Sequence, residues 1–295
     1  MRILLLGKDG QLGWELHRSL ATLGDVIAFD YPEIDLRHMK CTSMLQLIQE
    51  VQPKVIINAT AYTAVDQAES EPEAAFAING QAPGILAELA ADQAIALIHF
   101  STDYVFDGTK GSPYLETDPP GPVNIYGQSK LAGEQAILQV NSAYLILRTS
   151  WVYSLRRDSF VNKVLKWSRG QSTLRIVTDQ VGNPTWARML AEITAQALAK
   201  CDENIVDWIN QRKGIYHLAG DGAASRLEWA EAIMRFDPHG EEQTARQILP
   251  ALTSEFPTPA RRPLYSALNC DLFYDVFHLQ LPPWQRALQL AMEAA

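Results

Sequence analysis

The sequence has few cysteines, no long apolar run and no concentration of positive charge. Cys41, Cys201 and Cys270 are odd in number, lie far apart and form no Cys-x-x-Cys pair, which argues against disulfides and zinc. The six histidines also lack metal-ligand spacing, so we predict no metal site. A net charge of -9 has the wrong sign for a nucleic-acid surface. Because no segment has the length of a membrane span or a signal-peptide core, we expect a cytoplasmic protein without nucleic-acid or membrane partners.

Three spaced glycines near the N-terminus form the clearest motif. Gly7, Gly10 and Gly13 separate an apolar run, residues 3–6, from an amphipathic segment, which predicts a strand, a tight turn and a helix. In a dinucleotide site, one such glycine makes the turn, one admits the pyrophosphate and one lets the helix pack on the strand. Asp30 ends the next apolar run, where a carboxylate can bind ribose hydroxyls. We therefore predict nucleotide binding, with a turn that serves packing alone as the alternative.

The pattern after this motif predicts an α/β fold with a Rossmann-type doubly wound parallel sheet. Apolar runs without alternation, at residues 26–29, 55–57, 94–100 and 144–147, are separated by helical patterns. From Trp151 the pattern is less regular, and we expect a smaller, mixed α/β C-terminal domain that ends in a helix over 284–294. We place a mainly NAD(P)-binding domain at 1–150 and a mainly substrate-binding domain at 151–295, with some segments of the latter returning to the Rossmann sheet.

Three side chains have the chemistry of a carbonyl reductase. Tyr126 and Lys130 are four residues apart at the start of a predicted helix, so both lie on one face. A lysine ammonium there is expected to lower the tyrosine pKa and to make Tyr126 a general acid or base. Thr102 follows a predicted strand and can donate a hydrogen bond to the same carbonyl oxygen. The alternative for the Tyr-Lys pair alone is a solvated helix face.

Through these motifs the chain resembles the extended short-chain dehydrogenase/reductase family, and within it the dTDP-4-dehydrorhamnose reductase branch. The resemblance covers nearly the whole chain. It rests on ordered motifs at residues 7–13, 58–72, 101–108, 113–114, 126–134, 148–153, 179–185 and 262–268. It implies that NADPH or NADH reduces the 4-keto group of a dTDP-sugar, dTDP-4-dehydro-L-rhamnose, in dTDP-rhamnose biosynthesis. A homodimer is a further possibility that the resemblance raises.

The resemblance also implies site residues. The catalytic set is Thr102, Tyr126 and Lys130. The cofactor-binding set is Gly7, Gly10, Gln11, Leu12, Gly13, Asp30, Asp35, Leu36, Ala59, Ala61, Tyr62, Tyr126 and Lys130. The substrate-binding set is Thr63, Val65, Asp103, Tyr104, Trp151 and Arg262.

Two details of these sets have alternative readings in the sequence. Arg261 and Arg262 can meet the substrate diphosphate, or they can form a solvated loop before Pro263. Asp30 would repel a 2′-phosphate, whereas Lys8 or Arg37 can accommodate one, so the choice between NADPH and NADH is not decided.

The chain departs from the family pattern at two places. Ser159 stands where the family often has asparagine, which puts one substrate hydrogen bond in question. Some members dimerise through glutamates that hold magnesium; Glu15 matches one of them, but Arg188 occupies the other position, so we do not expect a metal-bridged dimer.

Other functions remain as alternatives. A nucleotide-sugar 4-epimerase or 4,6-dehydratase is one, although dehydratases carry Asp-Glu after the active-site threonine and Tyr104 stands in that place here. Another nucleotide-sugar 4-keto reductase is also compatible with the motifs. A non-catalytic NADP-binding regulatory subunit is the last, and the intact Thr102, Tyr126 and Lys130 speak against it.

Overall fold

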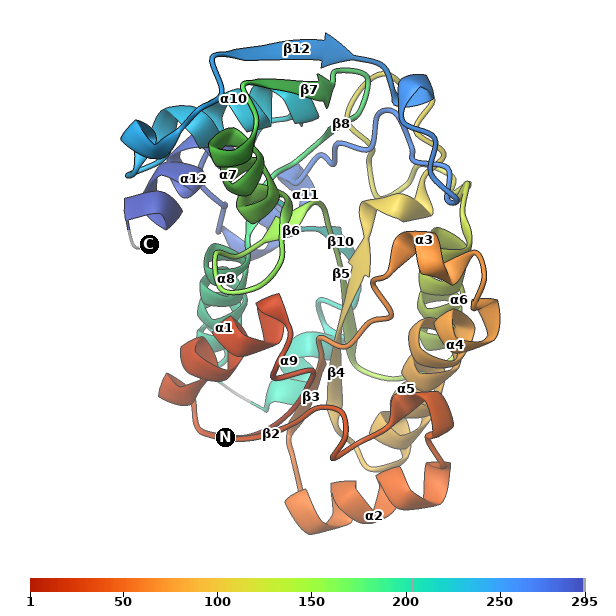
Figure 1. Ribbon diagram of the computed structural model, residues 1–295. Coiled ribbons are helices and arrows are strands. Elements are labelled where there is room, and N and C mark those ends of the chain that lie inside the picture. The colour runs from red at the N-terminus through yellow and green to blue at the C-terminus, as the bar shows by residue number, and fades with distance from the viewer. Residues whose placement is uncertain (203, 294–295) are drawn as a thin grey trace.

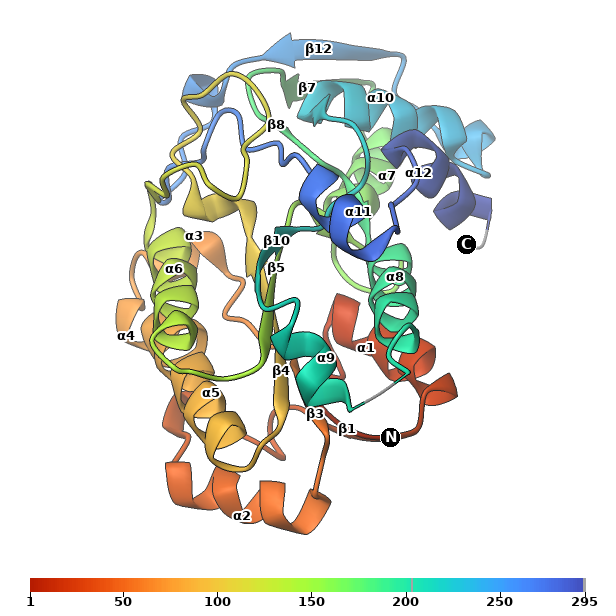
Figure 2. The same cartoon turned by 180° about the vertical axis from the view of Figure 1, so that it is seen from behind.

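A six-stranded parallel sheet forms the centre of the molecule, with helices on both faces (Figures 1 and 2). The computed structural model describes residues 1–202 and 204–293. The strand order is β10-β5-β4-β3-β1-β2, and every neighbouring pair is parallel. The strands are β1 Arg2–Leu6, β2 Asp25–Phe29, β3 Val55–Asn58, β4 Ala96–Thr102, β5 Tyr144–Thr149 and β10 Gly214–His217. This arrangement confirms the predicted α/β, doubly wound fold.

The strand order reverses beside β1, and this places the functional edge of the sheet. β2 pairs with one side of β1, while β3 pairs with the other and leads on to β4 and β5. In open parallel sheets, the helices diverge at such a point and leave a crevice outside the carboxyl ends of the strands. The residues that follow β1, β3, β4 and β5 are therefore brought together.

The central strands are apolar without alternation because both of their faces are covered. Ile3 and Leu5 of β1 join a core with Leu16 of α1 and Leu190 of α8. The other face of the same strand joins a second core with residues of α2 and α5. Figure 1 shows α1 and α8 on one side of the sheet and α5 and α6 on the other. These helices are α1 Gln11–Ser19, α2 Cys41–Val51, α5 Ala82–Asp92, α6 Ile125–Leu138 and α8 Ala187–Ala199.

The segment between β3 and α5 contains two short helices and a wider, π-helical turn directly before α5. α3 Val65–Ala68 and α4 Pro72–Phe76 are followed by a π-helical turn, η3 Ala77–Gln81, which leads directly into α5. Within that turn, Asn79 accepts a hydrogen bond from the Tyr62 N–H at 2.8 Å and donates to the Tyr62 carbonyl at 3.1 Å. The π turn therefore positions the buried Asn79 side chain to hydrogen-bond with the loop after β3, and these bonds hold the loop in place.

Much of the C-terminal half packs around a separate core above the sheet. Tyr153, Trp229 and Trp284 are buried in it. Around it lie three two-stranded sheets and three helices: β6 Val152–Tyr153 with β9 Thr185–Trp186, β7 Thr173–Val177 with β12 Gln247–Ala251, β8 Val181–Gly182 with β11 Ala224–Ser225, α7 Phe160–Gly170, α10 Arg226–Phe236 and α12 Trp284–Glu293.

Other C-terminal segments return to the central sheet. β10 pairs with β5. The helices α8, α9 Ile205–Asn210 and α11 Asp271–Phe277 contribute to the core on the α1 face of the sheet. The two-domain division at residue 150 itself stays a prediction. Short 3-10 turns complete the chain: η1 Leu20–Thr22, η2 Leu36–His38, η4 Asp103–Val105, η5 Gly240–Glu242 and η6 Thr253–Glu255.

The last helix, α12, begins at Trp284 as predicted and is described to Glu293. The predicted final position, 294, lies outside the described residues. Among the helices of residues 1–202 and 204–293, none is both long enough and apolar enough to cross a bilayer.

Candidate active site

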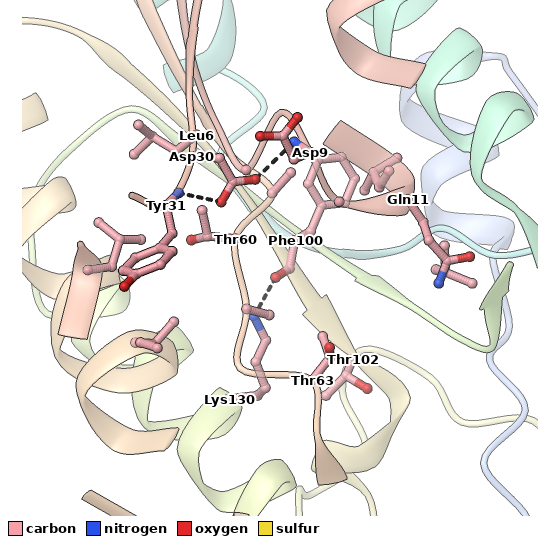
Figure 3. Close-up of a pocket in the computed structure, with 18 of the residues that line it drawn as sticks. Leu6, Asp9, Gln11, Asp30, Tyr31, Thr60, Thr63, Phe100, Thr102 and Lys130 are labelled. Atoms are coloured by element: carbon pink, nitrogen blue, oxygen red, sulfur yellow. Dashed lines mark hydrogen bonds between the residues drawn. The ribbon is translucent and has the colours of Figure 1, made fainter. Parts of the chain in front are cut away.

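A cleft of about 1160 Å³ opens along the carboxyl ends of β1, β3, β4 and β5. Figure 3 shows Asp9 and Gln11 on one side of it and Lys130 reaching in from α6, and Thr63 and Thr102 also line it. Most of the predicted site residues line this cleft: Gly7, Gly10, Gln11, Leu12, Asp30, Asp35, Leu36, Ala59, Ala61, Thr63, Thr102, Asp103, Tyr126, Lys130 and Trp151.

Five predicted residues are not among the described residues that line the cleft. Gly13 packs beneath the glycine turn, and Val65 begins α3. The Tyr62 hydroxyl donates to the Glu71 carboxylate at 2.9 Å. Tyr104 packs edge-on against the ring of Tyr126, with centroids 5.7 Å apart, and Arg262 pairs with Asp66 at 2.8 Å. Their contacts with ligands stay predictions.

The glycine turn has the geometry that a pyrophosphate needs. Gly7 has φ +95°, and a Cβ there would lie 2.8 Å from the Ala59 carbonyl carbon. A Cβ on Gly13 would lie 1.7 Å from the Gly7 oxygen, so α1 can pack this closely only without a side chain. Gly10 caps α1 with no side-chain hydrogen bond, which leaves the first-turn N–H groups open to an anion. The residues present therefore fit a dinucleotide phosphate.

Asp30 is held by two backbone donors at the next strand end. Its carboxylate accepts hydrogen bonds from the Asp9 N–H at 2.9 Å and the Tyr31 N–H at 2.8 Å (Figure 3). Three nearby side chains already have carboxylate partners. The Lys8 ammonium lies 2.5 Å from Glu33, the Arg37 guanidinium lies 3.8 Å from Glu71, and the His38 ring lies 2.9 Å from Asp35. An oriented carboxylate whose neighbours Lys8 and Arg37 already contact other carboxylates suits a ribose diol better than a 2′-phosphate.

We expect Asp30→Ala to weaken the binding of NADH about tenfold and to leave NADPH binding nearly unchanged or improved. The reason is that the substitution removes an acceptor for the ribose hydroxyls, and the same change removes a charge that repels the 2′-phosphate. Fluorescence titration of both cofactors checks this. An equal loss for the two would mean that Asp30 does not contact the ribose.

Tyr126 and Thr102 meet where α6 approaches the end of β4. Asn124 caps α6 by accepting from the Gly127 N–H at 2.8 Å, and this starts the helix so that Tyr126 stands in its first turn. Burial raises the pKa of Tyr126, while a hydrogen bond with the Thr102 hydroxyl opposes the rise. Tyr126 therefore holds its proton throughout the neutral range, as a proton donor must.

Lys130 is buried and turned toward the sheet. Its Nζ donates to the Phe100 carbonyl at 2.7 Å and lies 3.3 Å from His99 Nε2 (Figure 3 shows the Phe100 contact). Burial lowers the Lys130 pKa to about 8, with Glu134 acting in the opposite direction. The expectation that Lys130 lowers the Tyr126 pKa is wrong for this arrangement, because the Nζ proton faces Phe100 and burial dominates at the tyrosine.

Asp103 joins three segments beneath the site. It is 2% exposed and accepts hydrogen bonds from the hydroxyls of Ser266 at 2.5 Å, Ser150 at 3.0 Å and Thr102 at 3.1 Å. Burial raises its pKa to about 6, and the hydroxyl donors hold it below a still higher value. The Asp103 side chain thus orients Thr102; its predicted contact with a sugar nucleotide stays a prediction.

Trp151 packs against the C-terminal core and carries backbone strain. It has φ +43°, a region that a bulky residue rarely adopts, and such outliers concentrate at functional sites. Its ring stacks on Trp229 at 5.5 Å, and the Arg226 guanidinium lies 3.6 Å above it. Burial lowers the pKa of Arg226 to about 10, so the group stays cationic. The strained tryptophan therefore places an aromatic ring beside a positive charge.

Sequence reasoning missed several residues of this region. Thr60, Thr149 and Arg157 also line the cleft, and Arg226 stacks on its tryptophan. The spacing of the histidines indicates only that no metal site is expected, and it does not reveal that His99 contacts the predicted catalytic lysine. One signal was available for His99, because an ionisable residue inside a buried strand needs a polar partner.

The two departures from the family pattern have local explanations. Ser159 is the N-cap of α7, and its hydroxyl accepts from the Asn162 N–H at 3.3 Å. Burial raises the pKa of Glu15, and the nearby positive charge of Arg188 lowers it in part. Arg188 itself bonds to Glu192 at 2.9 Å. Ser159 therefore caps α7, and the positive charge beside Glu15 comes from Arg188.

Comparison with known sequences gives matches over the whole chain. The sequence profile described as "RmlD substrate binding domain" matches residues 1–295. The dTDP-4-dehydrorhamnose reductase of Burkholderia thailandensis is 42% identical over 99% of this chain and 98% of its own. The dTDP-4-dehydrorhamnose reductase of Escherichia coli K12 is 41% identical over 97% of this chain and 95% of its own.

Solved structures give the same result. A dTDP-4-dehydrorhamnose reductase from Clostridium acetobutylicum has a TM-score of 0.89 at 31% identity, covering 100% of this chain and 99% of that one. A dTDP-4-dehydrorhamnose reductase from Bacillus anthracis, in complex with NADP, has a TM-score of 0.88 with the same identity and coverage. A UDP-glucose 4-epimerase from Thermus thermophilus, 20% identical with a TM-score of 0.79, shares the fold.

Proposed function

Because the chain belongs to the RmlD substrate binding domain family, together with the dTDP-4-dehydrorhamnose reductases compared above, we propose that it catalyses the same reaction. It reduces the 4-keto group of dTDP-4-dehydro-L-rhamnose to give dTDP-L-rhamnose, with NADPH or NADH as the cofactor. The observation that carries this proposal is the convergence of Thr102, Tyr126 and Lys130 on one cleft beside the glycine turn. The NADP in the Bacillus anthracis structure supports the choice of cofactor.

When bound, the cofactor supplies the hydride that the C4 carbonyl receives. Charge then develops on the carbonyl oxygen and requires a proton. In our proposal Tyr126 donates this proton from its hydroxyl, which its raised pKa keeps protonated. The Thr102 hydroxyl donates its single proton to Asp103 at 3.1 Å in the structure. In our proposal this proton turns from Asp103 to the carbonyl oxygen when the substrate binds, and it then polarises the carbonyl.

The substrate side of the site pairs an aromatic surface with positive charge. Trp151 lines the cleft, and the Arg226 guanidinium lies 3.6 Å from the centre of its ring. A sugar ring packs well on an indole, and a guanidinium matches phosphate oxygens. Arg262 already pairs with Asp66, so we assign it a part in shaping this end of the site through that ion pair.

We expect kcat/KM to fall as the pH rises above about 8, tenfold for each further pH unit. Lys130 is cationic below its lowered pKa and loses its proton above it, so the positive potential beside the developing oxyanion is lost. Tyr126 stays protonated over the same range and adds no second step. Initial rates between pH 6 and 9.5 check this, and a flat profile to pH 9.5 would contradict it.

The deciding experiment follows nicotinamide absorbance when the protein meets dTDP-4-dehydro-L-rhamnose generated enzymatically in place. NADPH and NADH are compared in parallel. Rapid oxidation together with a dTDP-L-rhamnose product supports the proposal and ranks the cofactors. Cofactor binding without oxidation would favour a non-catalytic subunit instead, and oxidation only with a different keto-sugar would favour another reductase of the same class.

A further inference from the structure

A line of buried polar side chains runs behind the cleft and ends on Lys130. Asn58 at the end of β3, His99 in β4 and Lys130 in α6 are each at most 1% exposed. Asn58 Nδ2 lies 3.1 Å from His99 Nδ1, and His99 Nε2 lies 3.3 Å from Lys130 Nζ. At its other end, Asn58 Oδ1 bonds to Thr60, which lines the cleft. The line therefore connects the cleft wall to the lysine from behind.

The hydrogen bonds in this line have one possible direction. The Thr60 backbone N–H can only donate, and it donates to Asn58 Oδ1 at 3.1 Å. The Asn58 amide must therefore direct its Nδ2 protons at His99, so His99 Nδ1 accepts. His99 is neutral because burial holds its pKa well below the ordinary value. Its single ring proton then sits on Nε2 and points at Lys130 Nζ.

An N–H donor aimed at Nζ suits only one protonation state of the lysine. The uncharged amine can accept from His99 Nε2–H and still donate to the Phe100 carbonyl at 2.7 Å. The ammonium has three donors and no acceptor lone pair, so at this position it meets a second donor. The ammonium gains by moving away from His99, toward the cleft that Lys130 also lines.

We propose that Asn58 and His99 are positioning residues for Lys130: their one-way chain of hydrogen bonds retains the uncharged amine against Phe100 and releases the ammonium toward the reacting carbonyl. Lysine is then delivered to the site in its charged form. The effect on turnover rests on the reductase function proposed above. The direction of the chain does not.

The charged and titratable groups around Nζ leave this assignment intact. On α6 these are Tyr126 and Glu134, on β4 His99, and on β5 Arg148. Glu134 favours the ammonium, but its carboxylate is already bound by Arg148 at 2.6 Å. Asn58, the group that β3 contributes to the line, carries no charge.

The first test reads the chain direction without any substrate. Full-length protein labelled with ¹⁵N-histidine is examined by long-range proton–nitrogen NMR between pH 6 and 9, where the two imidazole tautomers have different nitrogen shifts. His99 is assigned by sequential assignment and by loss of its signals in His99→Gln. We expect the Nε2–H tautomer throughout. The Nδ1–H tautomer would overturn the proposal, because His99 would then accept from the ammonium.

The second test compares His99→Gln with His217→Gln in the coupled reductase assay. The glutamine can turn its amide oxygen toward Nζ and so retain the ammonium. We expect the alkaline limb of kcat/KM to move up by about one pH unit and kcat at pH 7 to fall about fivefold, with KM little changed. His217 is equally buried in a strand but bonds to Tyr114 and Asn269 carbonyls, so its variant should keep the wild-type limb.

The outcomes of the two tests are distinguishable. A His99→Gln enzyme that turns over with the wild-type alkaline limb overturns the positioning role. If wild-type protein oxidises neither cofactor, the proposed reductase function fails, and the tautomer measurement still decides the chain direction.

Discussion

Tyr126→Phe should lower kcat by a factor of about 10² to 10⁴, the range that a positioned general acid contributes. The ring keeps its place at the start of α6 and its contact with Tyr104, so only the donor hydroxyl is lost. Cofactor affinity should change less than twofold. Single-turnover kinetics with NADPH, alongside fluorescence titration of the cofactor, measure the two quantities separately.

Tyr153→Phe is the matched control for this experiment. It makes the same chemical change in a fully buried tyrosine of the C-terminal core. The hydroxyl of Tyr153 has no hydrogen-bond partner among the described residues. We expect a wild-type rate. If Tyr126→Phe also retains the wild-type rate, then another group donates the proton, and the assignment of Tyr126 must be given up.

Glu134→Leu should lower the free energy of unfolding by about 3–5 kcal/mol. Glu134 and Arg148 form a bidentate ion pair that links α6 to β5, with bonds of 2.9 and 2.6 Å, and both side chains are at most 3% exposed. Removing the carboxylate leaves a buried guanidinium without its counter-charge. Urea unfolding followed by circular dichroism measures the loss.

Two further variants define what the loss means. In Glu134→Leu/Arg148→Met neither charge remains, so stability should return to within about 2 kcal/mol of the wild type. Glu192→Gln breaks the partly exposed pair with Arg188 and should cost less than about 1 kcal/mol. A single-variant loss below 1 kcal/mol would show that the buried pair does not brace α6.

The sequence predicts the sheet and the cleft well because both depend on local patterns. A buried parallel strand is a continuous apolar run, and the glycine turn has a required spacing, so β1, β3, β4 and Gly7 could all be located. The strand predicted at 94–100 lies at Ala96–Thr102 in the structure. It continues past Phe100 because the polar residues Ser101 and Thr102 still pair with β5. Apolarity alone understates such a strand end.

The parts that could not be predicted depend on contacts between distant segments. Asp103 is joined to Ser266, which lies 163 residues later, and nothing in either local sequence indicates that bond. The same is true of Arg226, which reaches Trp151 from a different element. The direction of the Lys130 amine depends on its contacts with Phe100 and His99. Helix spacing therefore predicts which face of the helix carries the lysine, but it does not predict where Nζ points.

The return of β10 to the sheet has a consequence for how the protein is made. β5 receives its outer neighbour from residues 214–217, and α1 receives its cover from α8. During synthesis, the chain up to residue 150 leaves the ribosome with one sheet edge and one helix face still bare. The nucleotide-binding half therefore reaches its native form only after much of the other half has been translated, and a ribosome that stalls between them releases an incomplete sheet with an open edge.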